Sequence, residues 1–236
     1  MKKPLIGIIG KVQPQYGDDI WHRIDEVDEL RYLIVKNGGT AITLLPTEKT
    51  LKFNDNDIND DTILNDEEKD ELYRQIDLCD GFILQGGLYS SNYEIEMAKR
   101  IIELDKPLIG ICAGFNNILR ALGTVVTFDK TKSHDIYDKN YRHEVTILRN
   151  TKLYNLINKD KYNVNSIHTM IAYKENVEGY ATISSISYDG LVESFELSNK
   201  KFVIGIKWHP ELMLEDRLTN KLFKNFIESA SETENV

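Results

Sequence analysis

A Gly-x-Cys-x-Gly motif at residues 110–114 places a cysteine where a nucleophile could act. The motif ends the apolar run 108–111, which is typical of a buried strand, and a helix-like segment follows it. A sharp strand-to-helix turn presents Ser or Cys at its apex, and it needs small residues on both sides. Free N–H groups and the dipole at the start of a helix favour the thiolate of Cys112. The pattern predicts a cysteine nucleophile, although a buried cysteine between two structural glycines has the same sequence.

A cysteine hydrolase also needs a base that takes the thiol proton and a third group that orients the base. Among the five histidines, His209 follows the short apolar run 202–206 and precedes Glu211 by two residues. Residues two apart in extended backbone project to the same side, and the intervening proline fixes φ between them. If this run and the run before Cys112 are parallel strands, their carboxyl ends meet at one sheet edge. We interpret the three residues as a catalytic constellation; a surface His-Pro-Glu turn is the simpler alternative.

The elements that would position these residues alternate along the chain. Strand-like apolar runs occupy residues 5–9, 40–45, 81–85, 108–111 and 202–206. Amphipathic segments typical of helices occupy 23–36, 68–77, 93–104 and 216–229. This alternation indicates right-handed βαβ units and a parallel sheet. Shorter runs at 124–127, 143–148, 180–186 and 191–195 indicate antiparallel additions. We therefore predict an α/β fold with a mostly parallel central sheet and helices on both faces.

Neither a repeat nor a linker divides the sequence, so residues 1–236 are predicted to form a single domain. Residues 47–70 are rich in Asn and Asp and have few apolar anchors. They are predicted to be an exposed acidic insertion, with a lid or a partner-docking segment as the functional alternative. Residues 231–236 are predicted to be a flexible tail.

Composition excludes several classes of function. Acidic residues outnumber basic ones by 38 to 29, for a formal net charge of −9, which argues against nucleic acid or an anionic membrane as the main partner. The apolar run after Lys3 is too short for a signal peptide or a membrane span. Two cysteines imply no disulfide framework, and no Cys/His spacing predicts structural zinc. We expect a cytoplasmic globular protein in which Cys79 is an inert packing residue at the sheet edge opposite the site.

Several motifs in the right order give the chain a family resemblance. Gly-Ile-Cys-Ala-Gly, Gly-Ile-Lys-Trp-His-Pro-Glu and the Gly-Gly at 86–87 resemble the class I (triad) glutamine amidotransferases. The opening Lys-Pro-Leu-Ile-Gly-Ile, Val-Asn-Ser-Ile-His at 164–168 and Asp-Gly-Leu-Val-Glu at 189–193 resemble the peptidase C26 branch, of the γ-glutamyl-γ-aminobutyrate hydrolase type. The resemblance covers nearly the whole chain and implies a flavodoxin-like fold.

The resemblance also implies roles for individual residues. Cys112 corresponds to the nucleophile, His209 to the general base and acid, and Glu211 to the residue that orients the histidine. The backbone N–H groups of Gly87 and Ala113 correspond to the oxyanion hole. Neither a metal nor another cofactor is implied.

Four further residues are implied to bind substrate: Gly86, Asn116, Ser166 and His168. The chain departs from the family pattern around them, because Asn116 replaces a usual Gln and Ala113 a usual Arg. These departures spare the three catalytic positions but affect the region that would hold the substrate.

The remaining histidines have structural explanations. His168 is either a pocket residue or a partly buried structural histidine, while His134 and His143 are interpreted as structural. His22 is interpreted as a surface residue, with the mouth of the site as its alternative position.

Three functions remain open at this point. The leading one is hydrolysis of the γ-glutamyl amide of a small amine through a γ-glutamyl thioester, which releases glutamate and the amine. The second is a glutaminase subunit that supplies ammonia to a separate synthetase; these residues include no synthetase domain, which favours the first. The third is a non-catalytic binding or regulatory protein, against which the intact Cys112, His209 and Glu211 argue. The expected partner is a small γ-glutamyl substrate; a homo-oligomer is left open.

Overall fold

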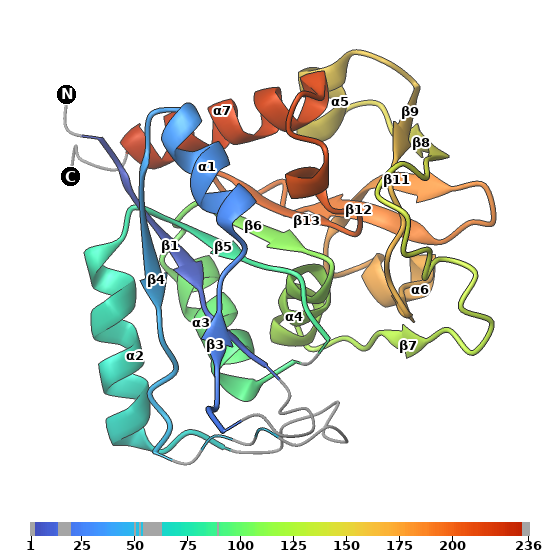
Figure 1. Ribbon diagram of the computed structural model, residues 1–236. Coiled ribbons are helices and arrows are strands. Elements are labelled where there is room, and N and C mark those ends of the chain that lie inside the picture. Colours follow the sequence, from blue (N-terminus) through green and yellow to red (C-terminus); the bar gives the residue numbers. More distant parts are fainter. Residues whose placement is uncertain are drawn as a thin grey trace.

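The computed structural model describes residues 3–13, 20–49, 51, 53, 63–88 and 90–232. Within them, one sheet in the order β4-β1-β5-β6-β13-β12-β11-β8-β9 forms the centre of the molecule (Figure 1). Its parallel half consists of β4 (Thr40–Leu44), β1 (Leu5–Ile9), β5 (Gly81–Leu84), β6 (Leu108–Ile111) and β13 (Val203–Ile206). Taken in chain order, these five strands have the 2-1-3-4-5 arrangement of the flavodoxin-like fold. The predicted α/β class is confirmed.

Four antiparallel strands continue the same sheet beyond β13. They are β12 (Val192–Glu196), β11 (Thr182–Ser187), β8 (His143–Ile147) and β9 (Lys161–Val164). Three of them lie at predicted runs. The sequence prediction omitted β9, whose side chains are mostly exposed or half-buried and therefore give no continuous apolar run.

Two small sheets correct the sequence predictions locally. The run at 124–127 contributes little, because only β7 (Thr127–Phe128) forms there, paired with β10 (Met170–Ile171). The helix predicted from residue 23 begins five residues later, because β3 (Ile24–Asp25) pairs with β2 (Lys11–Val12). Strand pairing overrides helical spacing there.

Helices cover both faces of the sheet, as predicted (Figure 1). One face packs against α1 (Asp28–Lys36), α5 (Lys152–Ile157) and α7 (Arg217–Ser231). The other packs against α2 (Asp66–Leu78), α3 (Asn92–Glu103), α4 (Ala113–Ala121) and α6 (Lys174–Val177). In β6, Ile109 and Ile111 belong to one core and Leu108 to the other. Burial on both faces explains why this strand reads as an unbroken apolar run.

The predicted insertion and tail lie partly outside the described residues. In the segment 47–70, α2 begins at Asp66, where Asn65 and Glu68 form a capping box. Thr47 donates to the Glu68 carbonyl oxygen at 2.6 Å and thereby ties the start of the segment to this helix. Residues 50, 52 and 54–62 are outside the described part, as are 233–236 of the predicted tail; Ser231 ends α7.

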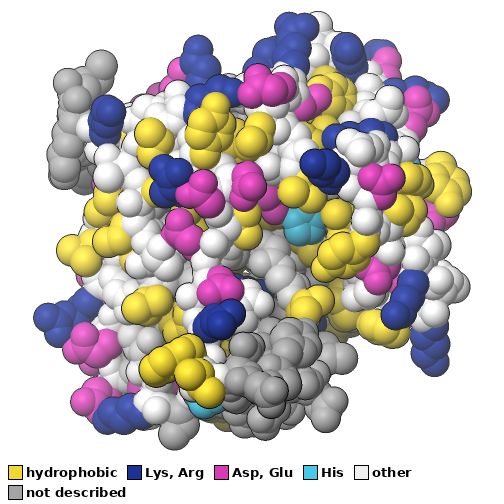
Figure 2. Space-filling view, viewed as in Figure 1, with side chains coloured by type: hydrophobic (Ala, Val, Ile, Leu, Met, Phe, Trp, Pro, Cys, Tyr) yellow, Lys and Arg dark blue, Asp and Glu magenta, His cyan; other side chains and the backbone are white. Residues whose placement is uncertain are grey.

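The surface carries charges of both signs. Figure 2 shows acidic and basic side chains interspersed over one face, with Lys and Arg gathered along the edge where α5 and α7 lie. Within the described residues, none of the helices has the length and apolar character that a membrane span requires.

Candidate active site

Cys112 lies at the apex of the turn between β6 and α4. Its φ of 50° and ψ of −98° are outside the regions that non-glycine residues usually occupy, which costs about 1–3 kcal/mol. A Cβ on Gly114 would lie 2.1 Å from the Leu84 carbonyl oxygen, and one on Gly110 would lie 2.7 Å from the Gly114 carbonyl oxygen. Both glycines are therefore needed for the close approach of α4 to the sheet, and the strand-turn-helix arrangement expected from the motif is present.

His209 and Glu211 follow β13 and reach the same sheet edge as Cys112. The Nδ1 atom of His209 lies 2.6 Å from Oε1 of the buried Glu211. A Cβ on Gly86, which follows β5, would lie 2.6 Å from Cε1 of His209 and 3.5 Å from Cβ of Cys112. The carboxyl ends of three parallel strands thus bring the cysteine, the imidazole and the carboxylate together, as the sequence predicted.

The electrostatic environment favours charge separation between Cys112 and His209. Burial raises the pKa of the Cys112 thiol, but His209 and Lys207 outweigh burial and hold it below the ordinary 9.0. Burial lowers the pKa of His209, but Glu211 and Cys112 outweigh burial and raise it well above 6.5. A thiolate beside an imidazolium is the state that these two directions support.

The segment after β9 contacts both His209 and Cys112. Asn165 donates from Nδ2 to the His209 carbonyl oxygen at 2.7 Å, and the His209 N–H donates to Asn165 Oδ1 at 2.8 Å. The Cys112 Sγ lies 3.7 Å from the Ile167 carbonyl oxygen. Sequence reasoning used 164–168 for the resemblance but gave Asn165 no role, since the paired amide bonds arise only when the strands assemble.

Lys207 is a buried cation beside the site, and sequence reasoning also gave it no role. Its Nζ donates to Asn116 Oδ1 at 2.5 Å and lies 4.6 Å from the centroid of the Phe115 ring. Burial lowers its pKa to about 8, against the opposing effect of Cys112 and Glu193. The signal in the sequence was a lysine directly after the apolar run 202–206, because a lysine next to a buried strand is rarely buried without a partner.

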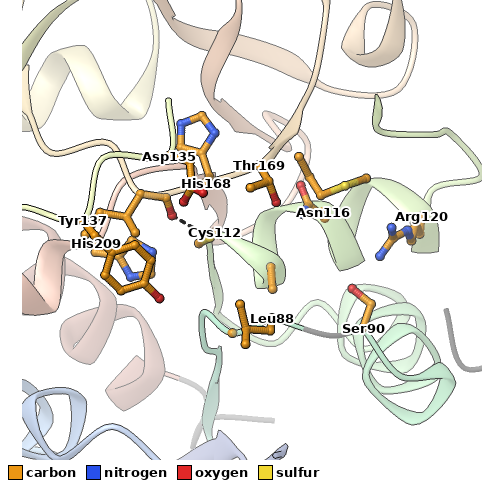
Figure 3. A pocket seen from close by; sticks show the side chains of 14 residues that line it. Leu88, Ser90, Cys112, Asn116, Arg120, Asp135, Tyr137, His168, Thr169 and His209 are labelled. Atoms are coloured by element: carbon orange, nitrogen blue, oxygen red, sulfur yellow. Dashed lines mark hydrogen bonds between the residues drawn. The ribbon is translucent and has the colours of Figure 1, made fainter. Parts of the chain in front are cut away.

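A pocket of about 210 Å³ opens at Cys112. Figure 3 shows Asn116 and Arg120 toward one end of it, on α4, and Tyr137 and His209 toward the other, with Cys112 between them. An acyl group can therefore approach the sulfur from within the pocket.

The two backbone positions predicted for the oxyanion hole both line this pocket. Ala113 is the first residue of α4, where N–H groups have no partner inside the helix. Gly87 packs closely on Lys11, because a Cβ at Gly87 would lie 2.7 Å from Lys11 Cε. Lys11 itself is held by a buried ion pair, with its Nζ 2.6 Å from Glu94 Oε1. The ion pair thereby holds Lys11 against the turn after β5 that carries Gly87.

The four predicted substrate-binding residues divide into two groups. Asn116 and His168 line the pocket, whereas Gly86 and Ser166 are not among its lining residues. Ser166 is 1% exposed, and its hydroxyl donates to the His134 carbonyl oxygen at 3.0 Å, so it lies behind the pocket wall. Gly86 instead makes room for the imidazole of the site. Neither residue is among those that line the pocket, and their substrate-binding role stays a prediction.

Other sequence interpretations find clear positions. His168 is buried and also lines the pocket, so both of its alternatives apply. Cys79 is buried just before β5, at the strand end opposite the site, and burial raises its pKa to about 11. The exposed His22 stacks on Phe53, with ring centroids 4.2 Å apart, and is not among the pocket residues.

Solved structures share this fold at low sequence identity. A glutamine amidotransferase from Thermotoga maritima is 15% identical with a TM-score of 0.61, over 99% of this chain and 100% of the other. The glutaminase domain of Trypanosoma brucei CTPS with bound acivicin is 14% identical with a TM-score of 0.63, over 99% of this chain and 96% of the other. The fold is that of the class I glutamine amidotransferases.

Sequence comparisons give the family. Residues 88–211, just over half of the chain, match peptidase C26. A glutamine amidotransferase-like protein of Rickettsia prowazekii is 23% identical, over 69% of this chain and 81% of its own. A glutamine amidotransferase-like protein of Lactococcus lactis is 21% identical, over 87% of this chain and 89% of its own. The CTP synthase of a Hydrogenobaculum strain is 34% identical over 104 residues, which are 43% of this chain and 16% of that enzyme. The chain belongs to the peptidase C26 family, and it is a hydrolase of the glutamine amidotransferase type.

Proposed function

We propose that this protein hydrolyses the γ-glutamyl amide bond of a small γ-glutamyl amine, with Cys112 as nucleophile. The observation that carries the proposal is the position of Cys112 in a strained turn, next to the His209–Glu211 pair and open to a small pocket. A non-catalytic protein would have no use for a cysteine held in this way.

The reaction would proceed in two acyl-transfer steps. The Cys112 thiolate attacks the γ-carbonyl carbon, and the oxyanion accepts hydrogen bonds from the N–H groups of Gly87 and Ala113, each worth about 3 kcal/mol. Protonated His209 gives its proton to the leaving amine, and a γ-glutamyl thioester forms on the sulfur. Neutral His209, oriented by Glu211, then takes a proton from water, which attacks the thioester and releases glutamate.

Asn116 and Arg120 would bind the glutamyl half of the substrate. A lysine ammonium only donates hydrogen bonds, so Lys207 fixes the oxygen of Asn116 toward itself and turns the NH2 group away. The pocket therefore offers the amide donors of Asn116 and the guanidinium of Arg120. Two donor groups at one end suit a carboxylate, and the small volume suits a substrate of amino-acid or dipeptide size.

The test is release of glutamate from a panel of γ-glutamyl amides, including glutamine and γ-glutamyl-γ-aminobutyrate. We expect release from γ-glutamyl amines, and a loss of about 10³-fold or more in Cys112→Ala. Cys79→Ala is the matched control, because this second cysteine lies at the opposite strand end, and it should keep the activity. Absence of release from every compound, with Cys112 inert to glutamine-like alkylating agents, would leave a binding protein as the better description.

A glutaminase subunit is the second candidate function. The similarity to part of a CTP synthase and to a CTPS glutaminase domain favours it. In that case glutamine alone would be hydrolysed, and a synthetase would co-purify with the protein and accept its ammonia. Efficient turnover of γ-glutamyl amines by the isolated chain would decide against this function.

A further inference from the structure

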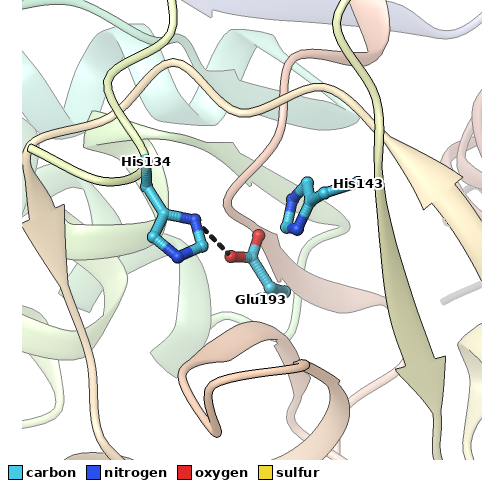
Figure 4. A group of neighbouring side chains, drawn as sticks. All are labelled: His134, His143 and Glu193. Carbon is cyan, nitrogen blue, oxygen red and sulfur yellow. Dashed lines mark ion pairs between the residues drawn. The ribbon is translucent and has the colours of Figure 1, made fainter.

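A cluster of imidazoles surrounds a buried carboxylate behind the pocket. It consists of His134 from a loop, His143 at the start of β8 and Glu193 in β12. These residues are 3%, 7% and 0% exposed, and one ligand atom of each lies within 4.8 Å of the others. Figure 4 shows the two rings on opposite sides of the Glu193 carboxylate.

Several polar atoms of this cluster have no hydrogen-bond partner among the described residues. They include both ring nitrogens of His143 and both carboxylate oxygens of Glu193. Glu193 Oε1 lies 3.6 Å from His134 Nδ1 and 3.6 Å from His168 Nε2, which is too long for a good hydrogen bond. A buried polar group without a partner loses its hydrogen bonds to water and gains none in return, so the cluster as it stands is unfavourable. A cation between these atoms would remove the cost.

The surroundings of His134 resemble those of a metal-binding histidine. Its Nε2 lies 3.0 Å from Asp189 Oδ2, so the carboxylate accepts a hydrogen bond from Nε2–H. Nδ1 then carries the lone pair, and it lies 3.0 Å from Ser166 Oγ and 3.6 Å from Glu193 Oε1. Histidine ligands in metal sites commonly donate their second ring N–H to a carboxylate in this way, which fixes the tautomer.

The alternative to a metal ion is a protonated His134, which would leave more of the buried polar atoms without a partner. Protonated Nδ1 of His134 could donate to Ser166 Oγ, 3.0 Å away, and attract Glu193. The two nitrogens of His143, however, would still be buried without a partner. A metal ion would bind one nitrogen of His143 as well as His134 and Glu193, and would thus leave fewer of these atoms without a partner.

We propose that His134, His143 and Glu193 bind a divalent transition-metal ion, with zinc as the best fit. Two imidazoles and one carboxylate form a known zinc ligand set, and imidazole nitrogen disfavours magnesium and calcium. Tetrahedral ligands at about 2.0–2.2 Å from zinc lie about 3.3–3.6 Å apart, close to the 3.6 Å between Nδ1 of His134 and Oε1 of Glu193. Sequence spacing did not indicate this site, because the ligands come from three separate segments.

The proposed metal would stabilise the wall behind the pocket. Ser166 and His168 adjoin the cluster, and they lie one and three residues after Asn165, which holds the backbone of His209. The metal is separate from the sulfur of Cys112, so it supports the geometry of the site and takes no part in acyl transfer.

The experiment uses Cys112→Ala protein, so that zinc cannot bind the reactive thiolate. The protein is stripped with a chelator, incubated with zinc or cobalt, desalted and analysed for metal. We expect about one equivalent of metal per chain, a higher Tm with zinc, and a visible cobalt spectrum of nitrogen and oxygen ligands. His143→Gln and the nearly isosteric Glu193→Gln, on the same background, should each retain at least tenfold less metal. His22→Gln is the control for a histidine outside the cluster and should retain it.

Two results would overturn the proposal. One is the lack of both retained metal and a cobalt spectrum in the Cys112→Ala protein, which would assign any binding in the unmodified protein to Cys112. The other is equal retention in the parent and in folded cluster variants. If both variants fail to fold, the cobalt spectrum of the parent decides alone, because it reports the ligand atoms directly.

Discussion

Cys112 and His209 shift one another's titration, and Lys207 acts on the same sulfur. Each of the two cationic groups stabilises the thiolate, while Glu211 stabilises the imidazolium. These charges act against burial, which alone would raise the pKa of the Cys112 thiol and keep it protonated. The ionisation of the Cys112 thiol at neutral pH therefore depends on charges supplied by the residues that follow β13.

The first prediction concerns the pH dependence of Cys112 alkylation. The rate should rise with pH through a midpoint below 9.0, because the folded-state pKa of this thiol is lowered. Lys207→Met removes one positive neighbour, so the midpoint should move to higher pH. The measurement is the rate of iodoacetamide modification at Cys112, with Cys79 as internal reference, since its pKa of about 11 keeps it unreactive. An unchanged midpoint in the variant would show that Lys207 has no electrostatic effect on the thiol.

The second prediction concerns Asn165. Asn165→Ala removes both hydrogen bonds to the His209 backbone and should lower kcat by about 10²-fold, because the base loses its fixed position. KM should change little, since Asn165 is not among the pocket residues. Asn165→Asp keeps the acceptor for the His209 N–H but places a buried carboxylate oxygen against the His209 carbonyl oxygen, so it should not restore the activity. A rise in KM with unchanged kcat would contradict this positioning role.

At the scale of elements, the close approach of α4 to β5 and β6 determines where Cys112, the proposed nucleophile, lies. The start of α4 packs against Leu84, the last residue of β5, so closely that only glycine fits at residue 114. The same approach places Ala113, the first residue of α4, at the pocket. The geometry of the site thus depends on how α4, β5 and β6 pack against one another.

Gly114→Ala should therefore lower the free energy of unfolding by about 3 kcal/mol, at the upper end for overpacking. Gly123→Ala is the matched control: Gly123 has a φ of +89° and open space around it, so only backbone strain of about 1 kcal/mol is expected. Urea denaturation of both variants measures the difference. Equal losses of unfolding free energy in the two variants would show that the close contact of residue 114 with β5 adds no cost of its own.

At the scale of the whole molecule, one sheet unites the two halves of the site. β13 pairs in parallel with β6 and antiparallel with β12, so it joins the flavodoxin-like half to the antiparallel extension. Cys112 belongs to the first half, and Asn165, which holds His209, to the second. Neither half alone carries a complete site.

We therefore predict one cooperative unfolding transition. The indole of Trp208 is buried directly before His209, whereas Trp21 is exposed, so tryptophan fluorescence follows the centre of the molecule. Far-UV circular dichroism follows all helices and strands. The two denaturation curves should coincide. Two separated transitions would show that the antiparallel extension unfolds as an independent unit.

The sequence by itself determined the features that depend on neighbours along the chain. Residues 110–114 predicted the elbow, the apolar runs predicted the strands buried on both faces, and the spacing of His209 and Glu211 predicted their pairing. Only the tertiary structure decided what Lys207 and Asn165 contact, and that Glu193 meets His134 and His143. Such contacts join segments far apart in sequence, and no local periodicity encodes them. The same long-range pairing turned residues 24–25 from predicted helix into strand.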